Sequence, residues 1–419
     1  MDFILDNYQD DAETDVIYLD YAKAFDKVDH ELLLVKLRFY GIQGELFDWI
    51  EQFLLDRMQK VVVDGKKSRS APVLSGVPQG TVLGPILFLL YVNDLEAVIS
   101  HSNMGCFADD TRMSKKITTS SDCDLLQSDL NNVVQWSIDN NMELHEDKFE
   151  LLVYKLPSNK KLAEDLPFIK EFQKTNYKTP NGNTIGQSHT VRDLGVHLSD
   201  DLSWSPHIGV MVDKAKQVAS WVLGVFKDRS STVMLQLYKS LIRSRLEYNS
   251  PLWSPSKIGD IQKIEAIQRY FTRQIIGMRD SSYWERMEKL NLMSLQRRRE
   301  RYSIIHLWKI LHNICPNDLQ ICFKENQRLG MRVVLPALRK KAATSAKSNY
   351  DQSFVVRAAK LWNTLPRHVN TADALPAFKT ALGNFLDTIP DNPPVSGCTT
   401  MNANSIIDWC DKKGGPQQA

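Results

Sequence analysis

Three aspartates at the ends of apolar runs are the residues best suited to chemistry in this chain of 419 residues. Asp20 ends the apolar run at residues 16–19, and Asp109 and Asp110 follow 89 residues later. Carboxylates presented by two short strands can hold two Mg²⁺ ions about 4 Å apart, which activate an attacking hydroxyl and stabilise a leaving pyrophosphate. The alternative is that an Asp-Asp pair is a solvated turn.

The segments around these aspartates predict the elements that position them. A buried strand over residues 16–19 ends at Asp20, and the pair at 109–110 lies between Phe107 and Thr111, as at the tip of a hairpin. A helix is predicted to begin at the N-cap Asp29. Further helices are predicted over residues 46–55, from the loop at 75–80 to about 99, and over 125–140, 208–226, 232–247, 258–277 and 283–313. Strands are predicted over residues 60–65, 149–153 and 191–198.

Composition narrows the class of protein. The apolar run at residues 86–92 is too short for a spanning helix, which needs about 20 residues. Six cysteines without a CxxC pair favour a reducing, intracellular setting, in the nucleus or the cytoplasm. The small net charge of +2 hides a division: residues 1–150 carry 27 acidic and 13 basic residues, and residues 151–419 carry 23 and 39. This division is typical of a polymerase that gathers metals on one side and phosphates on the other, although basic helices are often only solvated surfaces.

Three segments, at residues 18–30, 75–85 and 107–111, resemble in order and spacing the reverse transcriptase domain of non-LTR retrotransposons of the LINE-type, jockey-like kind. The resemblance covers roughly residues 10–390. It implies an α+β fold, in which a polymerase palm with an antiparallel sheet and packed helices is followed by an all-α thumb and C-terminal helices. The expected domains are a partial palm at 1–200, a helical thumb at 201–315, a small helical region at 316–390 and a disordered tail at 391–419.

The resemblance also implies roles for single residues. Asp20, Asp109 and Asp110 match the catalytic, metal-binding carboxylates, with Mg²⁺ as the expected ion and Mn²⁺ as the alternative. The other matched residues are Lys148 near the leaving pyrophosphate, Phe25 under the sugar, where it excludes a 2′-hydroxyl, and Gly76, Gln79 and Gly80 against the nucleotide and template. By pattern alone, the ordinary interpretation is that Lys148 is solvated, that Phe25 belongs to the core and that the glycine loop is a simple turn; the motif match favours the functional roles.

Residues 193–198 resemble the primer-grip hairpin of the family, and basic residues follow it along the predicted helices. Those expected to track a nucleic-acid backbone are Arg243, Arg245, Lys263, Arg269, Arg273 and Arg297-Arg298-Arg299. Each of them is also compatible with a solvated charge. A zinc site from His306, His312, Cys315 and Cys322 is disfavoured, because the spacing matches no common zinc pattern and the segment reads as a packed helix.

The reaction that the resemblance implies is RNA-directed DNA synthesis, with an RNA template, a DNA primer and deoxynucleoside triphosphates as partners and no membrane. The family carries a basic fingers region before its first carboxylate, whereas the 19 residues before Asp20 hold no Lys or Arg. We therefore expect a truncated, weakly active polymerase that works with a missing N-terminal part or an endonuclease-bearing partner. The alternative is a catalytically inactive, nucleic-acid-binding remnant.

Overall fold

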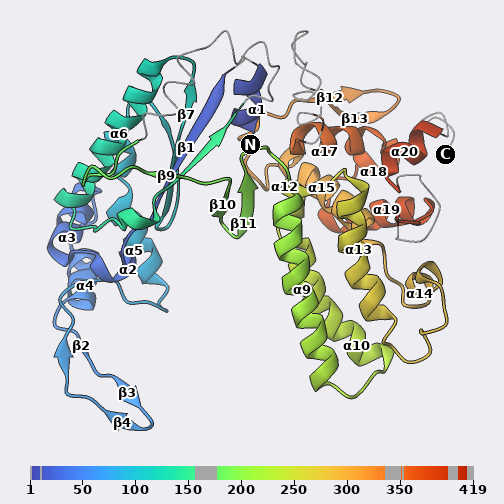
Figure 1. The fold of residues 1–419 in the computed structure, drawn as a ribbon, viewed down its shortest axis with the longest axis horizontal. Coiled ribbons are helices and arrows are strands. Elements are labelled where there is room, and N and C mark those ends of the chain that lie inside the picture. The colour runs from blue at the N-terminus through green and yellow to red at the C-terminus, as the bar shows by residue number, and fades with distance from the viewer. Residues whose placement is uncertain are drawn as a thin grey trace. The chain divides into compact units, whose positions relative to one another are not determined.

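The computed structural model describes residues 2–9, 12–155, 177–335, 351, 353–394 and 404–412, and it divides into two compact units (Figure 1). Residues 10–195 form the first, which we call the sheet unit. Residues 1–9, which hold α1 (Asp2–Gln9), join residues 196–419 in the second, which we call the helical unit. The predicted mixture of helices and a sheet is confirmed. Among the described residues, no helix combines the length and the apolar character that crossing a membrane requires.

The sheet unit is built on five strands in the order β6-β7-β1-β8-β9. Their bounds are β1 (Glu13–Leu19), β6 (Asn103–Phe107), β7 (Asp110–Ile117), β8 (Glu150–Tyr154) and β9 (Gly186–Gln187). The pairs among β6, β7, β1 and β8 are antiparallel, and β9 adds a parallel edge. The central strand β1 is buried along almost its whole length, which agrees with the apolar run that predicted it.

Helices form the rest of the sheet unit's core. They are α2 (Ala24–Lys27), α3 (His30–Phe39), α4 (Glu45–Leu54), α5 (Leu83–Val92), the 3₁₀ turn η1 (Leu95–Val98), α6 (Ser120–Asp139) and η2 (Glu146–Lys148). The side chain of Asp29 accepts a hydrogen bond from Leu32 N at 3.0 Å, so the predicted N-cap is confirmed. The helix predicted to reach residue 99 ends at Val92. α6 begins earlier than predicted, because Thr119 and Asp122 form a capping box.

The helical unit begins with β11 (Val196–Ser199) and continues as a bundle. Its helices are α9 (Ser205–Val225), α10 (Ser231–Leu237), the π-helix η3 (Tyr238–Arg243), α11 (Ser244–Glu247), α12 (Ser250–Trp253), α13 (Ile258–Thr272), α14 (Tyr283–Lys289) and α15 (Leu295–Leu311). The single helix predicted over 283–313 is wrong. It is broken before Ser294, whose side chain accepts from Arg297 N at 2.9 Å and starts a new helix.

The C-terminal part of the helical unit has a core of its own. It contains β12 (Phe323–Asn326), β13 (Gly330–Val333), α17 (Phe354–Asn363), α18 (Arg367–Asn370), α19 (Leu375–Asp387) and α20 (Ile406–Lys412). The hairpin of β12 and β13 was not predicted. Ile406 and Cys410 of α20 are buried in this core, so residues 404–412 do not match the predicted disordered tail. Four of its seven residues are apolar, but so short a segment cannot show the repeated spacing that predicts a buried helix.

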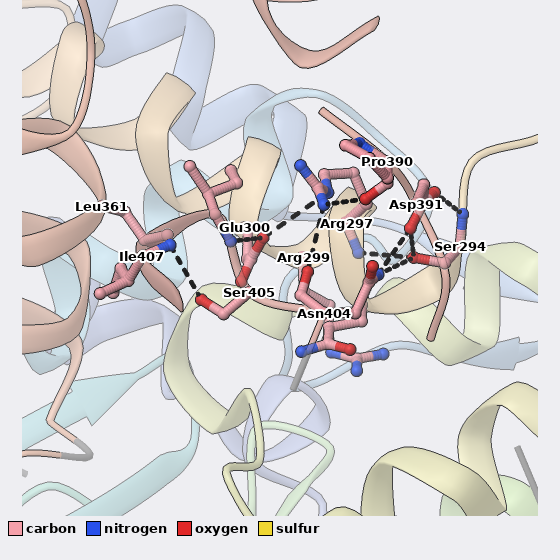
Figure 2. Close-up of polar contacts among 12 residues, drawn as sticks. Ser294, Arg297, Arg299, Glu300, Leu361, Pro390, Asp391, Asn404, Ser405 and Ile407 are labelled. Atoms are coloured by element: carbon pink, nitrogen blue, oxygen red, sulfur yellow. Dashed lines mark hydrogen bonds and ion pairs between the residues drawn. The ribbon is translucent and has the colours of Figure 1, made fainter. Parts of the chain in front are cut away.

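A buried polar network joins α15 to the C-terminal segment (Figure 2). Arg297 is 2% exposed and donates to the carbonyl oxygens of Pro390 and Asn404, both at 3.1 Å. Asp391 accepts from Ser294 Oγ at 2.6 Å and from Asn404 Nδ2 at 2.6 Å. Arg297 therefore ties the chain together instead of facing a backbone phosphate.

The neighbours of Arg297 on α15 are also engaged within the protein. Arg299 is 1% exposed, and Arg298 bonds Glu247 with two nitrogens. The prediction that these three arginines track a nucleic acid is therefore wrong. The sequence did not show that this face of α15 is covered.

Candidate active site

Strand pairing brings the first predicted carboxylate beside the other two. β1 and β7 are antiparallel, with Leu19 opposite Thr111 in the register. The next residue of each strand end is therefore Asp20 on one side and Asp110 on the other. Two segments that are 89 residues apart in the sequence thus present carboxylates at one edge of the sheet.

The turn that carries Asp109 is tight and strained. β6 and β7 are joined by Ala108 and Asp109 alone, with Phe107 paired to Asp110, so the predicted hairpin tip is confirmed. Ala108 has a φ of 55°, which costs a residue other than glycine roughly 1–2 kcal/mol. Strain of this kind persists where the surroundings fix the backbone, and it often marks a functional site.

The other end of the hairpin is held by α6. The buried carboxylate of Asp129 accepts hydrogen bonds from the backbone nitrogens of Ser100, His101 and Ser102 at 3.1, 2.9 and 2.7 Å. These bonds lower the pKa of Asp129, although its burial opposes them. The carboxylate therefore remains charged and anchors the segment that leads into β6.

Lys148 lies against the first carboxylate. Backbone pairing continues past β1, since His145 N donates to Asp20 O at 2.8 Å, and this brings η2 to the end of the strand. The ammonium group of Lys148 then reaches Asp20 Oδ2 at 2.6 Å. Both side chains are partly exposed, at 58% and 31%, so the ion pair adds little to stability but fixes the position of a cation at the site.

A cavity of about 390 Å³ opens at this edge of the sheet. Its polar lining is Asp20, Asp110, Arg112, Asp147, Lys148, Glu150, Arg192 and Asp193. Partial burial raises the pKa of Asp110, and the negative charges of Asp109, Asp193 and Asp20 raise it further. The site thus concentrates more negative charge than its own cations offset.

Four charged residues of this cavity were missed by the sequence analysis: the acidic Asp147 and Glu150 and the basic Arg112 and Arg192. Arg112 Nη1 donates to Asp193 Oδ2 at 2.6 Å, which fixes the end of β10 (Thr190–Asp193) beside β7. Arg112 follows Asp110 by two positions, and side chains two apart on a strand share a face. This spacing was the sequence signal that could have placed Arg112 at the site. For Arg192, only the fold shows its proximity to the carboxylates.

The carboxylate edge fits a hard divalent cation by its donor chemistry, since oxygen ligands and an excess of negative charge are what such ions require. Within the described ranges, however, no three His, Cys, Asp or Glu side chains converge as a ready-made metal site. Asp20 directs one oxygen to Lys148. Asp109 and Asp110 are the remaining ligand candidates here.

The predicted nucleotide loop packs against the segment that follows Asp20. Gly76 N donates to Val28 O at 2.8 Å, and Val77 N donates to Phe25 O at 2.9 Å. Gly76 has a φ of 87°, and a Cβ added there would lie 2.8 Å from the Cα of Asp26. Glycine is therefore required at this position by both conformation and space.

Of the other two loop residues, Asp26 holds only Gln79. Gln79 Nε2 donates to Asp26 Oδ1 at 2.9 Å, while Gly80, with a φ of 80°, has open space around it. Phe25 is half-buried, and its ring stacks on Phe88 of α5 with centroids 4.2 Å apart. The structure thus brings Phe25, Gly76 and Gln79 together, and Phe25 also serves the core.

A larger cavity of about 910 Å³ lies elsewhere in the sheet unit. The C-terminal end of α6, the loop at residues 180–183, Asp29 and Ser75 line it. None of the three candidate metal ligands does so, whereas Asp20 and Asp110 line the smaller cavity. We therefore place the candidate active site at the smaller cavity.

The basic candidates of the helical unit differ in exposure. Arg243 has 16% of its side chain exposed and lies 3.7 Å from Glu247. Arg245, Lys263, Arg269 and Arg273 are exposed. Lys263 lies 3.1 Å from Asp260 on its own helix. The side chains of these four residues are exposed, as contact with a phosphate would require.

The residues considered for zinc lie on and after α15. His306 meets the ring of Phe354 edge-on at 5.3 Å, and His312 stacks on Trp308 at 3.8 Å. Trp308 is buried, so the predicted packed helix is confirmed.

Comparison with known proteins finds sequence similarity to one family. Residues 5–198 match the family described as "Reverse transcriptase (RNA-dependent DNA polymerase)". The chain is 27% identical over 273 residues to the RNA-directed DNA polymerase from mobile element jockey of Drosophila melanogaster, which covers 62% of this chain and 28% of that protein. It is 26% identical over 282 residues to the probable RNA-directed DNA polymerase from transposon X-element of the same species, covering 65% and 29%.

The chain therefore spans less than a third of the length of these relatives. Among solved structures, it is similar to apo telomerase from Candida tropicalis, with 11% identity, a TM-score of 0.38 and coverage of 76% and 56%. It is also similar to telomerase from Candida albicans with a fragment of telomeric RNA, with 10% identity, a TM-score of 0.32 and coverage of 73% of this chain and 51% of that chain. The similarity to the reverse transcriptase family rests on the sequence matches.

Proposed function

We propose that residues 5–198, which match the reverse transcriptase family, form a reverse transcriptase domain of the non-LTR retrotransposon kind, and that the chain catalyses RNA-directed DNA synthesis. The substrates would be a primer 3′-hydroxyl, an RNA template and deoxynucleoside triphosphates. The observation that carries the proposal is the register of β1 and β7, because it sets Asp20 across from Asp110 and the Asp109 turn. A reverse transcriptase requires a divalent metal, and we propose Mg²⁺.

We propose that Asp20, Asp109 and Asp110 hold this ion. When bound, it would lower the pKa of the attacking hydroxyl and offset charge on the phosphate that is transferred. The raised pKa of Asp110 supports the proposal: burial is its main cause, but the nearby carboxylates raise it further, and a divalent cation would relieve that repulsion. Lys148 would leave Asp20 and turn to the leaving pyrophosphate, where its ammonium group offsets charge or donates a proton.

The nucleotide would lie between the carboxylates and the Gly76 loop. We propose that Phe25 supports the sugar and leaves no room for a 2′-hydroxyl, since its stacking on Phe88 fixes the ring. Gly76, Gln79 and Gly80 would contact the nucleotide and template, and the docking of the loop on residues 25–28 supports this role.

The domain roles follow from the same family. We propose that the sheet unit is the palm and that the helices after residue 200 act as the thumb. Arg245, Lys263, Arg269 and Arg273 would contact backbone phosphates, whereas Arg243 is mostly buried beside Glu247.

A primer-extension assay tests the proposal. The full chain with a primed RNA template, Mg²⁺ and all four deoxynucleotides should extend the primer, and Asp110→Asn should reduce the rate by about a hundredfold or more, as loss of a group that stabilises transition-state charge does. The matched control is Asp124→Asn, an exposed aspartate on α6. Extension by Asp110→Asn at the rate of the control would refute the assigned site.

A further inference from the structure

A two-stranded arm projects from the sheet unit and takes no part in the candidate active site. It comprises residues 57–73, in which β2 (Met58–Gln59) pairs with β5 (Ala71–Pro72) and β3 (Val62–Val63) pairs with β4 (Lys66–Lys67). Figure 1 shows it extending beyond α4. Every residue from 58 to 72 is exposed, so the arm has no core of its own.

The charge of the arm is opposite to that of the unit that carries it. Residues 57–73 hold five basic residues and one acidic residue. The rest of residues 10–195 holds 15 basic and 28 acidic residues. Because the charge changes sign at the base of the arm, the arm would attract a polyanion that the remainder of the unit repels.

The strand register gathers three of these charges on one face. Val62 is opposite Lys67, and Ser68 N donates to Val61 O at 2.8 Å. The next pair, Gln59 with Ala71, is offset from this register by one residue, so Lys60 lies across from Arg69 and Ser70 together. Opposite residues share a face, and so do residues two apart on one strand. Lys60, Lys67 and Arg69 therefore lie on one face, which we call the basic face.

The basic face is unfavourable for the arm alone. Like charges close together on one face of a strand pair repel each other, and an isolated two-stranded ribbon is at best marginally stable in water. An anionic partner would remove the repulsion and supply the missing contacts. The arrangement is therefore suited to binding and not to stability.

We propose that the basic face of the arm binds the sugar–phosphate backbone of nucleic acid. The choice of nucleic acid as partner rests on the proposed function, whereas the site itself rests on the charge and exposure of the arm. A two-stranded ribbon is narrow enough to enter the major groove of a DNA duplex, and lysine and arginine supply the phosphate contacts. RNA and DNA share this chemistry, so the experiment must include both.

Binding measurements on the full chain test the proposal. The variant Lys60→Gln/Lys67→Gln/Arg69→Gln removes the basic face. The matched control Lys324→Gln/Arg328→Gln/Lys379→Gln removes three exposed charges from the C-terminal part of the helical unit. Fluorescence anisotropy would follow labelled single-stranded RNA, an RNA–DNA hybrid and duplex DNA across a salt series.

We expect the arm variant to lose affinity by roughly ten- to a hundredfold and to flatten the plot of log affinity against log salt by about 2 to 3 on duplexes, the value for three lost phosphate contacts. The control should keep the slope of the unaltered chain. Comparison of the three probes shows whether RNA or DNA is the preferred backbone.

Three results would overturn the proposal. Slopes that are equal for the arm variant and the control would exclude the contact. Aggregation of the arm variant with an unchanged slope would mean that the lysines only protect exposed strands from pairing. The third result is an unchanged slope together with sedimentation in which the unaltered chain self-associates and the arm variant does not. It would mean that the arm binds the acidic surface of a second copy of the chain.

The proposed function can fail separately. If the unaltered chain does not extend a primer but the arm variant still loses its salt-dependent binding, the polymerase proposal fails and the arm proposal stands. If Asp110→Asn abolishes extension while the arm variant binds every probe like the control, the reverse holds.

Discussion

Gly76 and Gly80 offer a matched pair of substitutions that tests how the nucleotide loop is positioned. Both glycines have positive φ, 87° and 80°, so alanine at either position costs about 1–2 kcal/mol of backbone strain. Only Gly76 faces an obstacle, since an added Cβ would lie 2.8, 2.9 and 3.0 Å from the Cα, O and C of Asp26. Gly80 has open space around its Cα.

The difference between the two variants isolates the contact with Asp26. Non-bonded carbon atoms pack at about 3.5–4.0 Å from each other, so the loop must move outward by several tenths of an ångström in Gly76→Ala. Forcing extra volume into a packed site costs about 1–3 kcal/mol. The movement also strains the hydrogen bond from Val77 N to Phe25 O, which holds the loop at 2.9 Å.

Hydrogen exchange at the Val77 amide measures this cost directly. We expect Gly76→Ala to accelerate exchange there by about 5- to 150-fold relative to Gly80→Ala, the factor that corresponds to 1–3 kcal/mol of local opening. Primer extension should show a higher KM for the nucleotide in Gly76→Ala. Equal exchange rates in the two variants would refute the conclusion that the Asp26 backbone dictates glycine at position 76.

Three further predictions concern the same unit. Lys148→Ala should slow primer extension by about a hundredfold, while it changes the free energy of unfolding by less than about 1 kcal/mol. The control is Lys27→Ala, which removes another exposed ion pair. An equal loss of rate in this control would contradict the role of Lys148. Burial raises the pKa of Asp15 to about 6, so the folded protein holds a proton that the unfolded chain releases, and the free energy of unfolding falls as pH rises from about 4 to 6. Asp15→Asn should therefore slow amide exchange in β1 at pH 7.5, because it raises the free energy of opening by up to about 3 kcal/mol. At pH 4 it should change the exchange rate little. A stabilisation of the same size at both pH values would exclude the buried charge of Asp15 as its cause. Ala108→Gly should stabilise the hairpin by about 0.5–1 kcal/mol because it relieves the positive φ, whereas Ala97→Gly, at an exposed 3₁₀ position, should destabilise by a similar amount; thermal unfolding that shows the same sign for both would refute the strain.

The elements nearest the carboxylates were predictable because their signals are local. The apolar run before Asp20 and the bracketing of Asp109-Asp110 each involve fewer than ten residues, and the structure confirms the strand and the hairpin tip. The N-cap at Asp29 is equally local. Capping and alternation act over one turn or one strand, so the sequence alone carries them.

Features that depend on distant partners were not predictable. The burial of Arg297 depends on Pro390 and Asn404, about a hundred residues away, and α20 is held by the core that it meets. Arg192 faces Asp110 only because the fold brings β10 near β7. A helix pattern cannot tell whether its charged face is covered.

Cation binding tests the central claim, that the carboxylates at 20, 109 and 110 share a metal, most directly. Mn²⁺ titration followed by electron paramagnetic resonance would use the full chain and the variants Asp20→Asn and Asp110→Asn, with Asp124→Asn as the control. We predict that each of the first two weakens Mn²⁺ binding by at least about tenfold and that the control binds like the unaltered chain. Indistinguishable Mn²⁺ binding by all four proteins would contradict the account.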